Sequence, residues 1–386
     1  MTEAPIYLDY AASTPVDERV WARMREVSGQ TCANPSSTHA AGALAQQIIA
    51  GAAGQLAGLL NTAPDRLIWT SGATESDNLA IAGGARHRTH KGRHLVTMKT
   101  EHKAVTDVFE KLAQEGFDVS WVEPGANGVL DAGDFTAALR DDTQLVSIML
   151  VNNETGVIQD VETLGSICRE RDILFHVDAA QAVGKVHIDL SALPIDLLSM
   201  TAHKCYGPKG IGALYIADHP GCHVEPLLFG GGQQRRIRPG TLPTELIAGF
   251  GMAAEIAADR IDEDLAHLRD LRRILWTGIG SVDGLLLNGH HEGFPGILNV
   301  SVAGVDGESL LLDLEPLLVA TGSACNSKTQ EPSYVLRALG RTDFEAQSAI
   351  RFSFGRQTTP EEIEFAVARY RAAVRRLRDL APGAAA

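Results

Sequence analysis

The chain has 386 residues, and its 34 lysines and arginines against 48 aspartates and glutamates give a net charge of −14. This length predicts two domains with a large core. The acidic balance argues against direct nucleic-acid binding or an anionic membrane as a partner, and no apolar run reaches the roughly 18 residues of a membrane span. The N-terminal residues lack the basic and apolar segments of a secretory signal. We therefore expect a cytoplasmic protein.

From about residue 67 to residue 216, short β-branched runs alternate with longer amphipathic stretches. Strands are predicted at 67–69, 94–98, 145–150, 173–177 and 197–200, with helices such as 104–115 and 161–171 between them. Strands that alternate with helices predict βαβ units and a mainly parallel sheet.

The second part of the chain begins with a long predicted helix over 247–274, which is typical of a connection between a large and a small domain. Strands at 296–302 and 349–354 are mixed with helices after it. The segment Thr359-Pro360-Glu361-Glu362 predicts a capped start of the last helix. The final residues 382–386 are expected to fray.

Polar or ionisable segments follow each strand of the first part. They are 71–76, 100–103, 152–156, 178–181 and 201–204. In an open parallel sheet, ligands bind outside the carboxyl ends of the strands. Each segment taken alone is equally typical of a turn, but together they predict a binding site at one edge of the sheet.

The chemistry of these segments indicates a cofactor. The small residues 71–74 at a strand-to-helix turn favour phosphate binding by backbone N–H groups. Asp178 follows an apolar run, where a carboxylate needs a cationic partner, and Lys204 is placed similarly, where desolvation makes the amine a nucleophile towards carbonyls. A salt bridge between the two is the alternative. With the phosphate site, they describe pyridoxal 5'-phosphate (PLP).

Longer motifs extend this pattern across nearly the whole chain. They are Tyr7-Leu8-Asp9-Tyr10-Ala11-Ala12, Asn34-Pro35-Ser36-Ser37, Ser71-Gly72-Ala73-Thr74-Glu75-Ser76-Asp77-Asn78, Thr100-Glu101-His102-Lys103-Ala104-Val105, Val151-Asn152-Asn153-Glu154, His176-Val177-Asp178-Ala179, His203-Lys204, Tyr206-Gly207-Pro208-Lys209-Gly210, Arg238-Pro239-Gly240-Thr241-Leu242-Pro243, Gly322-Ser323-Ala324-Cys325, Glu331-Pro332-Ser333-Tyr334-Val335-Leu336 and Arg351-Phe352-Ser353-Phe354-Gly355-Arg356. On these motifs the sequence resembles the cysteine desulfurases of the housekeeping iron–sulfur-assembly type, which are class V aminotransferase-like PLP enzymes of fold type I.

The resemblance implies an α/β fold. A large PLP-binding domain, 14–256, would hold a mainly parallel mixed sheet between helices. A smaller α+β domain, 1–13 with 257–386, would carry the loop of the catalytic cysteine.

The resemblance also implies roles for individual residues. Lys204 would bond covalently to the cofactor aldehyde and move the substrate Cα proton. Asp178 would pair with the pyridinium nitrogen, Gln181 would hydrogen-bond the phenolate oxygen, and His102 would stack on the ring and take part in proton transfer. The phosphate would be held by Ala73, Thr74, Thr201 and His203, and by Thr241 of the neighbouring subunit, which implies a homodimer.

The substrate-binding residues implied are Asn34, Asn153 and Arg351, with Asn153 also near the phenolate. The guanidinium of Arg351 suits the planar α-carboxylate of L-cysteine; a surface ion pair at a strand start is the alternative for this arginine.

Cys325 selects the reaction. Its surroundings, residues 322–330, are small and polar and are typical of an exposed loop, where a cysteine can form a reactive thiolate. By resemblance it attacks the sulfur of L-cysteine, leaves alanine, and carries a persulfide to an acceptor protein such as an iron–sulfur scaffold or a tRNA-thiolation relay. Members of the family usually continue past the last helix in a tail that helps dock the scaffold; the given sequence stops at Ala386, so either it is shortened or docking differs.

The other cysteines, Cys32, Cys168, Cys205 and Cys222, are expected to be bystanders. An odd, sparse set predicts no disulfide framework. The spacing of Cys205 and Cys222 with His219 and His223 fits no usual zinc pattern, so no metal site is predicted.

Two other functions fit parts of the pattern. A selenocysteine lyase or transaminase-like relative would use the same cofactor, but a transaminase has no use for the loop cysteine, and selenocysteine cleavage would survive Cys325→Ala. A non-catalytic scaffold that keeps the fold is disfavoured because Lys204 and Asp178 are both present.

Overall fold

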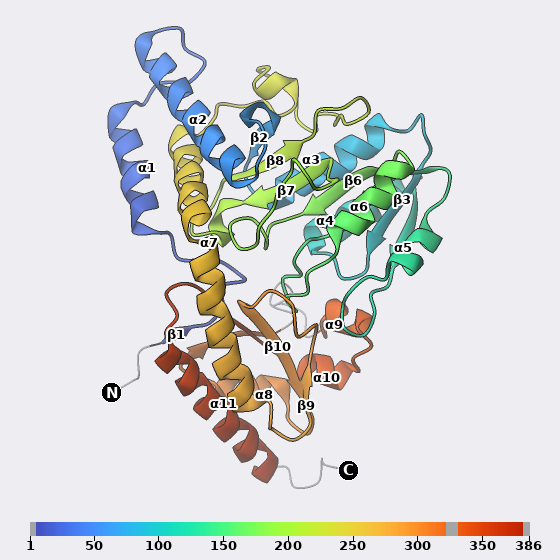
Figure 1. Cartoon of the computed structure of the whole chain (residues 1–386), viewed down its shortest axis with the longest axis vertical. Helices are drawn as coiled ribbons and strands as arrows, with labels where there is room; N and C mark the ends of the chain where they lie inside the picture. Colours follow the sequence, from blue (N-terminus) through green and yellow to red (C-terminus); the bar gives the residue numbers. More distant parts are fainter. Residues whose placement is uncertain (1–4, 322–330, 381–386) are drawn as a thin grey trace.

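The computed structural model describes residues 5–321 and 331–380. They form two regions along the long helix α7 (Thr244–Ile279), which crosses the molecule in Figure 1. One region contains a seven-stranded sheet, and the other contains a four-stranded sheet with helix α11 (Pro360–Leu380) packed beside α7.

The seven-stranded sheet is mainly parallel, as predicted. Its spatial order is β2 (Leu67–Thr70), β8 (Gly212–Ile216), β7 (Leu197–Thr201), β6 (Leu174–Asp178), β5 (Thr143–Ser147), β3 (His94–Met98) and β4 (Asp118–Val122). Only β8 runs antiparallel to its neighbours in this sheet. The sequence patterns did not predict β4 or β8, and β5 begins and ends earlier than the predicted strand at 145–150.

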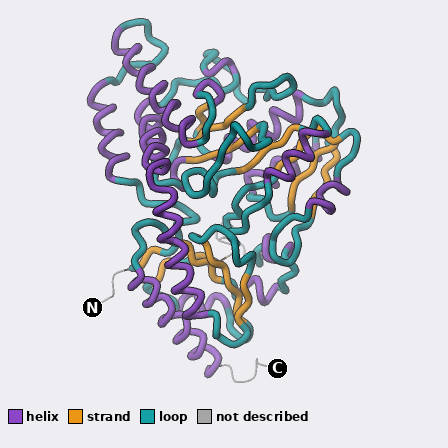
Figure 2. The backbone as a smooth tube through the Cα atoms, viewed as in Figure 1, coloured by secondary structure: helices purple, strands orange, loops and turns teal. Residues whose placement is uncertain are grey.

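Helices cover both faces of this sheet, as Figure 2 shows. Side chains alternate between the faces, as the period of a strand requires: Leu174 and Leu197 pack with α3 (Ala73–His87) and α4 (Lys103–Gln114), whereas Phe175 and Leu198 belong to the core on the other side. That second core includes α2 (Ala40–Leu59), α5 (Ala132–Ala138), α6 (Val161–Glu170) and the first half of α7, and α1 (Glu18–Gln30) packs against α7. Because both faces are covered, every residue of these strands except those of β4 is buried.

The four-stranded sheet is antiparallel. Its order is β12 (Ala320–Thr321), β13 (Ile350–Ser353), β10 (Ile297–Val302) and β9 (Leu285–Leu287), accompanied by α8 (Gly307–Asp313), α9 (Tyr334–Ala338) and α10 (Asp343–Gln347). Near the N-terminus, β1 (Ile6–Tyr7) pairs with β11 (Leu317–Leu318). The domain limits 14–256 and 1–13 with 257–386 stay a prediction.

The predicted start of the last helix is confirmed. Thr359 Oγ1 accepts a hydrogen bond from the N–H of Glu362 at 3.3 Å, and Glu362 Oε2 accepts one from the N–H of Thr359 at 2.9 Å. These reciprocal bonds satisfy N–H groups that a helix leaves open at its start. None of the helices in the described part of the chain is both long enough and apolar enough to cross a membrane.

Candidate active site

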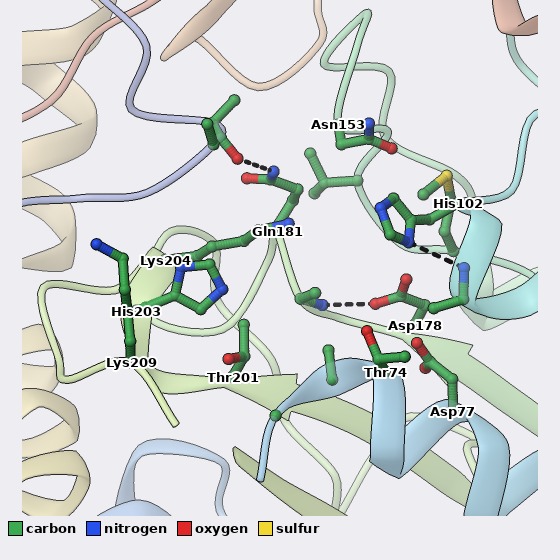
Figure 3. A pocket seen from close by; sticks show the side chains of 18 of the residues that line it. Thr74, Asp77, His102, Asn153, Asp178, Gln181, Thr201, His203, Lys204 and Lys209 are labelled. Atoms are coloured by element: carbon green, nitrogen blue, oxygen red, sulfur yellow. Dashed lines mark hydrogen bonds between the residues drawn. The ribbon is translucent and has the colours of Figure 1, made fainter. Parts of the chain in front are cut away.

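A cavity of about 630 Å³ lies at the carboxyl edge of the seven-stranded sheet. Residues at or just after the ends of β3, β5, β6 and β7 line it, as parallel strands with polar ends require. Figure 3 shows how these side chains converge. The predicted site residues in its lining are Ala73, Thr74, His102, Asn153, Asp178, Gln181, Thr201, His203, Lys204 and Arg351.

Three predicted site residues are not part of this lining. Asn34 and Thr241 are exposed and lie outside the cavity of this single chain; the Asn34 side chain accepts a hydrogen bond from the N–H of Ser36 at 2.9 Å. Cys325 lies outside the described residues. Their roles stay predictions.

One end of the cavity is suited to a phosphate. Helix α3 begins here, and the N–H groups of its first turn have no carbonyl partner within the helix. A Cβ at Gly212 would lie 2.6 Å from the Cα of Gly72, so only a glycine lets β8 approach the start of α3 this closely. The polar lining nearest to the start of α3 comprises Thr74 and Thr201, with His203 beyond Thr201.

Asp178 and His102 are oriented by backbone N–H groups. Asp178 ends β6, is 4% exposed, and accepts a hydrogen bond from Ala180 N–H at 2.8 Å. His102 is the N-cap of α4, where its Nδ1 accepts from Ala104 N–H at 3.1 Å. Burial, and then the nearby Lys204, lower the pKa of His102. The ring is therefore neutral at pH 7, and its proton is on Nε2 because Nδ1 accepts a hydrogen bond. His102 lines the cavity as a side chain that can accept or release one proton.

Beside Asp178 lies a buried polar cluster that the sequence patterns did not predict. Asp77, on the first turns of α3, lines the cavity, and burial followed by the charge of Asp178 raises its pKa well above the usual range. His176 Nε2 lies 3.6 Å from Asp77 Oδ1, but burial lowers the pKa of His176 to about 3. The contact is therefore not an ion pair, and His176 instead bridges Ser147 at 2.8 Å and Ser199 at 2.9 Å.

Arg351 and Asn153 form another wall of the cavity. Arg351 is 5% exposed; its Nη2 donates to Asp9 Oδ1 at 2.7 Å and its Nη1 donates to the Asn153 carbonyl at 2.8 Å. Arg351 Nε and Asn153 Oδ1 are buried without a hydrogen-bond partner among the described residues. Unsatisfied buried polar atoms are costly, and both residues line the cavity, where a polar ligand would offer such atoms partners.

These features fit PLP. The start of α3 suits an anionic phosphate, the buried Asp178 suits a protonated ring nitrogen, and the Lys204 amine suits an aldehyde. Lys209 and Asp77 are additions to the predicted site. Both lie within motifs named in the sequence analysis, 71–78 and 206–210, but the sequence pattern alone did not predict that their side chains line the cavity.

The described cysteines differ in exposure. Cys168, Cys205 and Cys222 are buried, and burial raises the pKa of Cys205 to about 11 and that of Cys222 to about 12. Such thiols are inert. Cys32 is exposed. Within residues 5–321 and 331–380, no group of three or more His, Cys, Asp or Glu side chains could hold a metal ion.

Comparison with known proteins identifies the family. The model of the aminotransferase class-V family matches residues 6–365. Cysteine desulfurase IscS of Neisseria meningitidis serogroup C is 50% identical over 382 residues, which cover 98% of this chain and 95% of that relative. A solved NifS-like protein has a TM-score of 0.89 and 34% identity, with 97% and 100% of the two chains covered. SspA, solved in complex with cysteine, has a TM-score of 0.82 and 37% identity, with 90% and 98% covered.

The matches extend over both regions of the fold, and they agree with a cavity whose residues suit PLP. The chain therefore belongs to the aminotransferase class-V family, among its cysteine desulfurases.

Proposed function

We propose that this chain binds PLP in the cavity at the sheet edge and converts L-cysteine to L-alanine, with Cys325 receiving the sulfur as a persulfide. The observation that carries the proposal is that Lys204, Asp178 and His102, from three separate segments, line one cavity. When bound, PLP supplies an electron sink that allows bonds at the substrate Cα and Cβ to be made and broken.

The residues of the cavity would divide the work. Lys204 would hold the cofactor through its amine and then move the substrate Cα proton. Asp178 would accept the ring N–H, and His102 would lie against the ring. The phosphate would be bound by the start of α3 and its neighbours, namely Ala73, Thr74, Thr201 and His203.

The sulfur step balances without an external oxidant. The Cys325 thiolate attacks the sulfur of bound L-cysteine, an S–S bond forms, and the substrate Cβ–S bond breaks with its electron pair passing to Cβ. The protons lost by the thiol and by the substrate end on alanine and on the persulfide. One sulfur atom is thus gained by the protein for each alanine released.

Intact-mass measurement after addition of L-cysteine without reductant tests this function, with alanine quantified in the same sample. We expect one added sulfur per chain, mapped to Cys325 and matched by alanine. Alanine without added mass would contradict storage of the sulfur on the protein. No alanine would contradict L-cysteine as the substrate.

Arg351 and Asn153, with Asn34, would bind the substrate, and Asp9 gives a test. Asp9 is the anionic partner of Arg351, so Asp9→Asn should leave the guanidinium poorly oriented for a carboxylate. We expect KM for L-cysteine to rise about tenfold, because charge-assisted hydrogen bonds are worth about 1.5–3 kcal/mol, with kcat little changed.

Steady-state kinetics would measure this change. Asp262→Asn, at a side chain 87% exposed on α7, is the matched control. A lower KM in Asp9→Asn would mean that Asp9 competes with the substrate carboxylate for Arg351.

The proposal includes a homodimer. Thr241 is exposed and lies outside the cavity of its own chain, and Leu228 and Phe229, earlier in the same long connection, are 54% and 88% exposed. Large exposed apolar side chains are typical of an interface. A second copy covering them would bring Thr241 to the phosphate of the neighbouring cavity.

Thr241→Ala should therefore weaken PLP retention by roughly tenfold, the loss of one hydrogen bond to a charged group. Equilibrium dialysis against PLP measures this, and Thr89→Ala, at an exposed position just after the end of α3, serves as control. A monomer by light scattering would contradict the shared site.

We further propose that the persulfide passes to an acceptor protein in the cytoplasm, either an iron–sulfur scaffold or a tRNA-thiolation relay. The relatives named IscS support sulfur transfer as the role of the reaction.

A further inference from the structure

Gln181 lies in the turn after β6 and lines the cavity, and both ends of its amide are engaged. Its Nε2 donates to the carbonyl of Ala11 at 2.7 Å, and its Oε1 accepts from the Nζ of Lys185 at 2.8 Å. Gln181 is 2% exposed. Figure 3 shows the amide directed at the cavity with its bond to the N-terminal segment.

These two partners determine which way the amide points. A carbonyl can only accept a hydrogen bond and a lysine ammonium can only donate one. With the amide reversed, the Gln181 oxygen would face the Ala11 oxygen, and its NH₂ would face the ammonium. Both contacts would be repulsive, so Ala11 and Lys185 select the same orientation.

The orientation leaves a donor for the cavity. An amide NH₂ carries two hydrogens, and the Ala11 carbonyl takes one of them. The other is available to a ligand, whereas the Gln181 oxygen is turned towards Lys185. Gln181 can therefore offer a ligand an N–H and not its carbonyl oxygen, and an N–H is what an anionic phenolate oxygen needs.

The surroundings of Lys185 favour this positioning role over an ion pair. The Nζ of Lys185 donates its hydrogen bond to a neutral amide, that of Gln181. The same atom lies 5.8 Å from the centre of the Phe294 ring. Lys185 lines a small cavity together with Tyr10, Tyr206 and Asp264. The Asp264 carboxylate forms its ion pair with Arg356, at 2.7 Å, and not with Lys185.

Burial and the charge of Lys204 lower the pKa of Lys185 to about 7, with Arg351 also lowering it and Cys205 opposing. The neutral amine keeps N–H groups that can donate to Gln181, but its lone pair could also accept from a reversed amide. Lys185 therefore selects the orientation most strongly below pH 7, where it is an ammonium, and Ala11 selects it at every pH.

We propose that Lys185 is a positioning residue that holds the Gln181 amide with its N–H towards the phenolate oxygen of the cofactor. This inference rests on the proposed function, because it assigns the ligand of Gln181 as PLP. It implies that Lys185 acts on the cofactor only through Gln181.

A double-mutant cycle tests that implication. Apoproteins carrying Lys185→Met, Gln181→Ala or both are titrated with PLP in the absence of L-cysteine. Each single substitution should weaken PLP binding about tenfold, the effect of one hydrogen bond to a charged acceptor. The double variant should bind as Gln181→Ala does, because Lys185 has nothing left to orient. A combined loss of roughly a hundredfold, the product of independent effects, would overturn the proposal.

The absorbance of bound PLP gives a second readout. A phenolate that loses a hydrogen-bond donor holds a proton more tightly, so the pH midpoint of the visible absorbance change should rise in Lys185→Met and in Gln181→Ala alike. An unchanged midpoint in Lys185→Met would overturn the proposal. Lys111→Met, at a side chain 64% exposed on α4, is the matched control.

Gln181→Glu covers the case in which Lys185→Met does not fold. It leaves Lys185 in place with a charged acceptor, but an ionised carboxylate has no hydrogen for Ala11 or for the phenolate. PLP affinity should fall at least tenfold, and wild-type affinity would overturn the proposal. If the unmodified chain binds no PLP, the proposed function fails first, and measurement of that chain in the same series separates the two cases.

Discussion

Replacing Lys204 with alanine is expected to reduce alanine formation from L-cysteine by at least about 10⁴-fold, the upper range for loss of a positioned acid–base group. Lys204 lies in the short 3₁₀ turn Ala202–Lys204 that follows β7, and it lines the cavity with Asp178 and His102. In the proposed function the same amine holds the cofactor and moves the Cα proton. Lys209 is the other lysine in the cavity lining.

Single-turnover alanine formation, measured with the variant loaded with excess PLP, would test this expectation. The fold should survive, because alanine is compatible with a short turn, and circular dichroism would check it. Lys111→Ala on the exposed face of α4 is the matched control. Turnover near the wild-type rate would contradict the role of Lys204. Lys209, which also lines the cavity, would then be the next lysine to test as the amine that holds the cofactor.

Replacing Cys325 with serine should abolish persulfide formation while leaving PLP binding intact. A serine hydroxyl is not ionised at neutral pH and does not attack sulfur, so no S–S bond can form on this side chain. We expect less than about 1% of the wild-type added mass, on the scale of losing an activated nucleophile.

Cys32→Ser is the natural control, because Cys32 is the exposed cysteine among the described residues. Cys168, Cys205 and Cys222 cannot substitute for Cys325, since burial raises their pKa. Normal sulfide release by Cys325→Ser would contradict its role as nucleophile. Unimpaired cleavage of selenocysteine by the same variant would support the selenocysteine lyase alternative.

Much of the site was predictable from the sequence because its residues follow strands. A parallel sheet brings the carboxyl ends of its strands to one edge, so polar residues after 94–98, 174–178 and 197–201 had to meet there. His102, Asp178 and Lys204 were found in this way. The same local logic predicted the cap at Thr359, since a capping box depends on residues three apart.

Strand β8 was harder to predict. It begins at Gly212 and follows a glycine-containing turn, so its apolar run did not stand out from its surroundings. Its antiparallel direction between β2 and β7 is a property of the assembled sheet. No local pattern records which neighbour a strand will pair with.

The sequence by itself determined the alternation of strands and helices, the sheet edge at which the site lies, and the groups that suit PLP, because each depends on local periodicity or on the ends of elements. Only the tertiary structure decided the contacts that orient those groups. Arg351 meets Asp9 across 342 positions of the chain, and Gln181 meets Ala11 across 170. Such pairs form only when separate elements pack together, so neither the local sequence around each residue nor the distance between them in the chain predicts the contact.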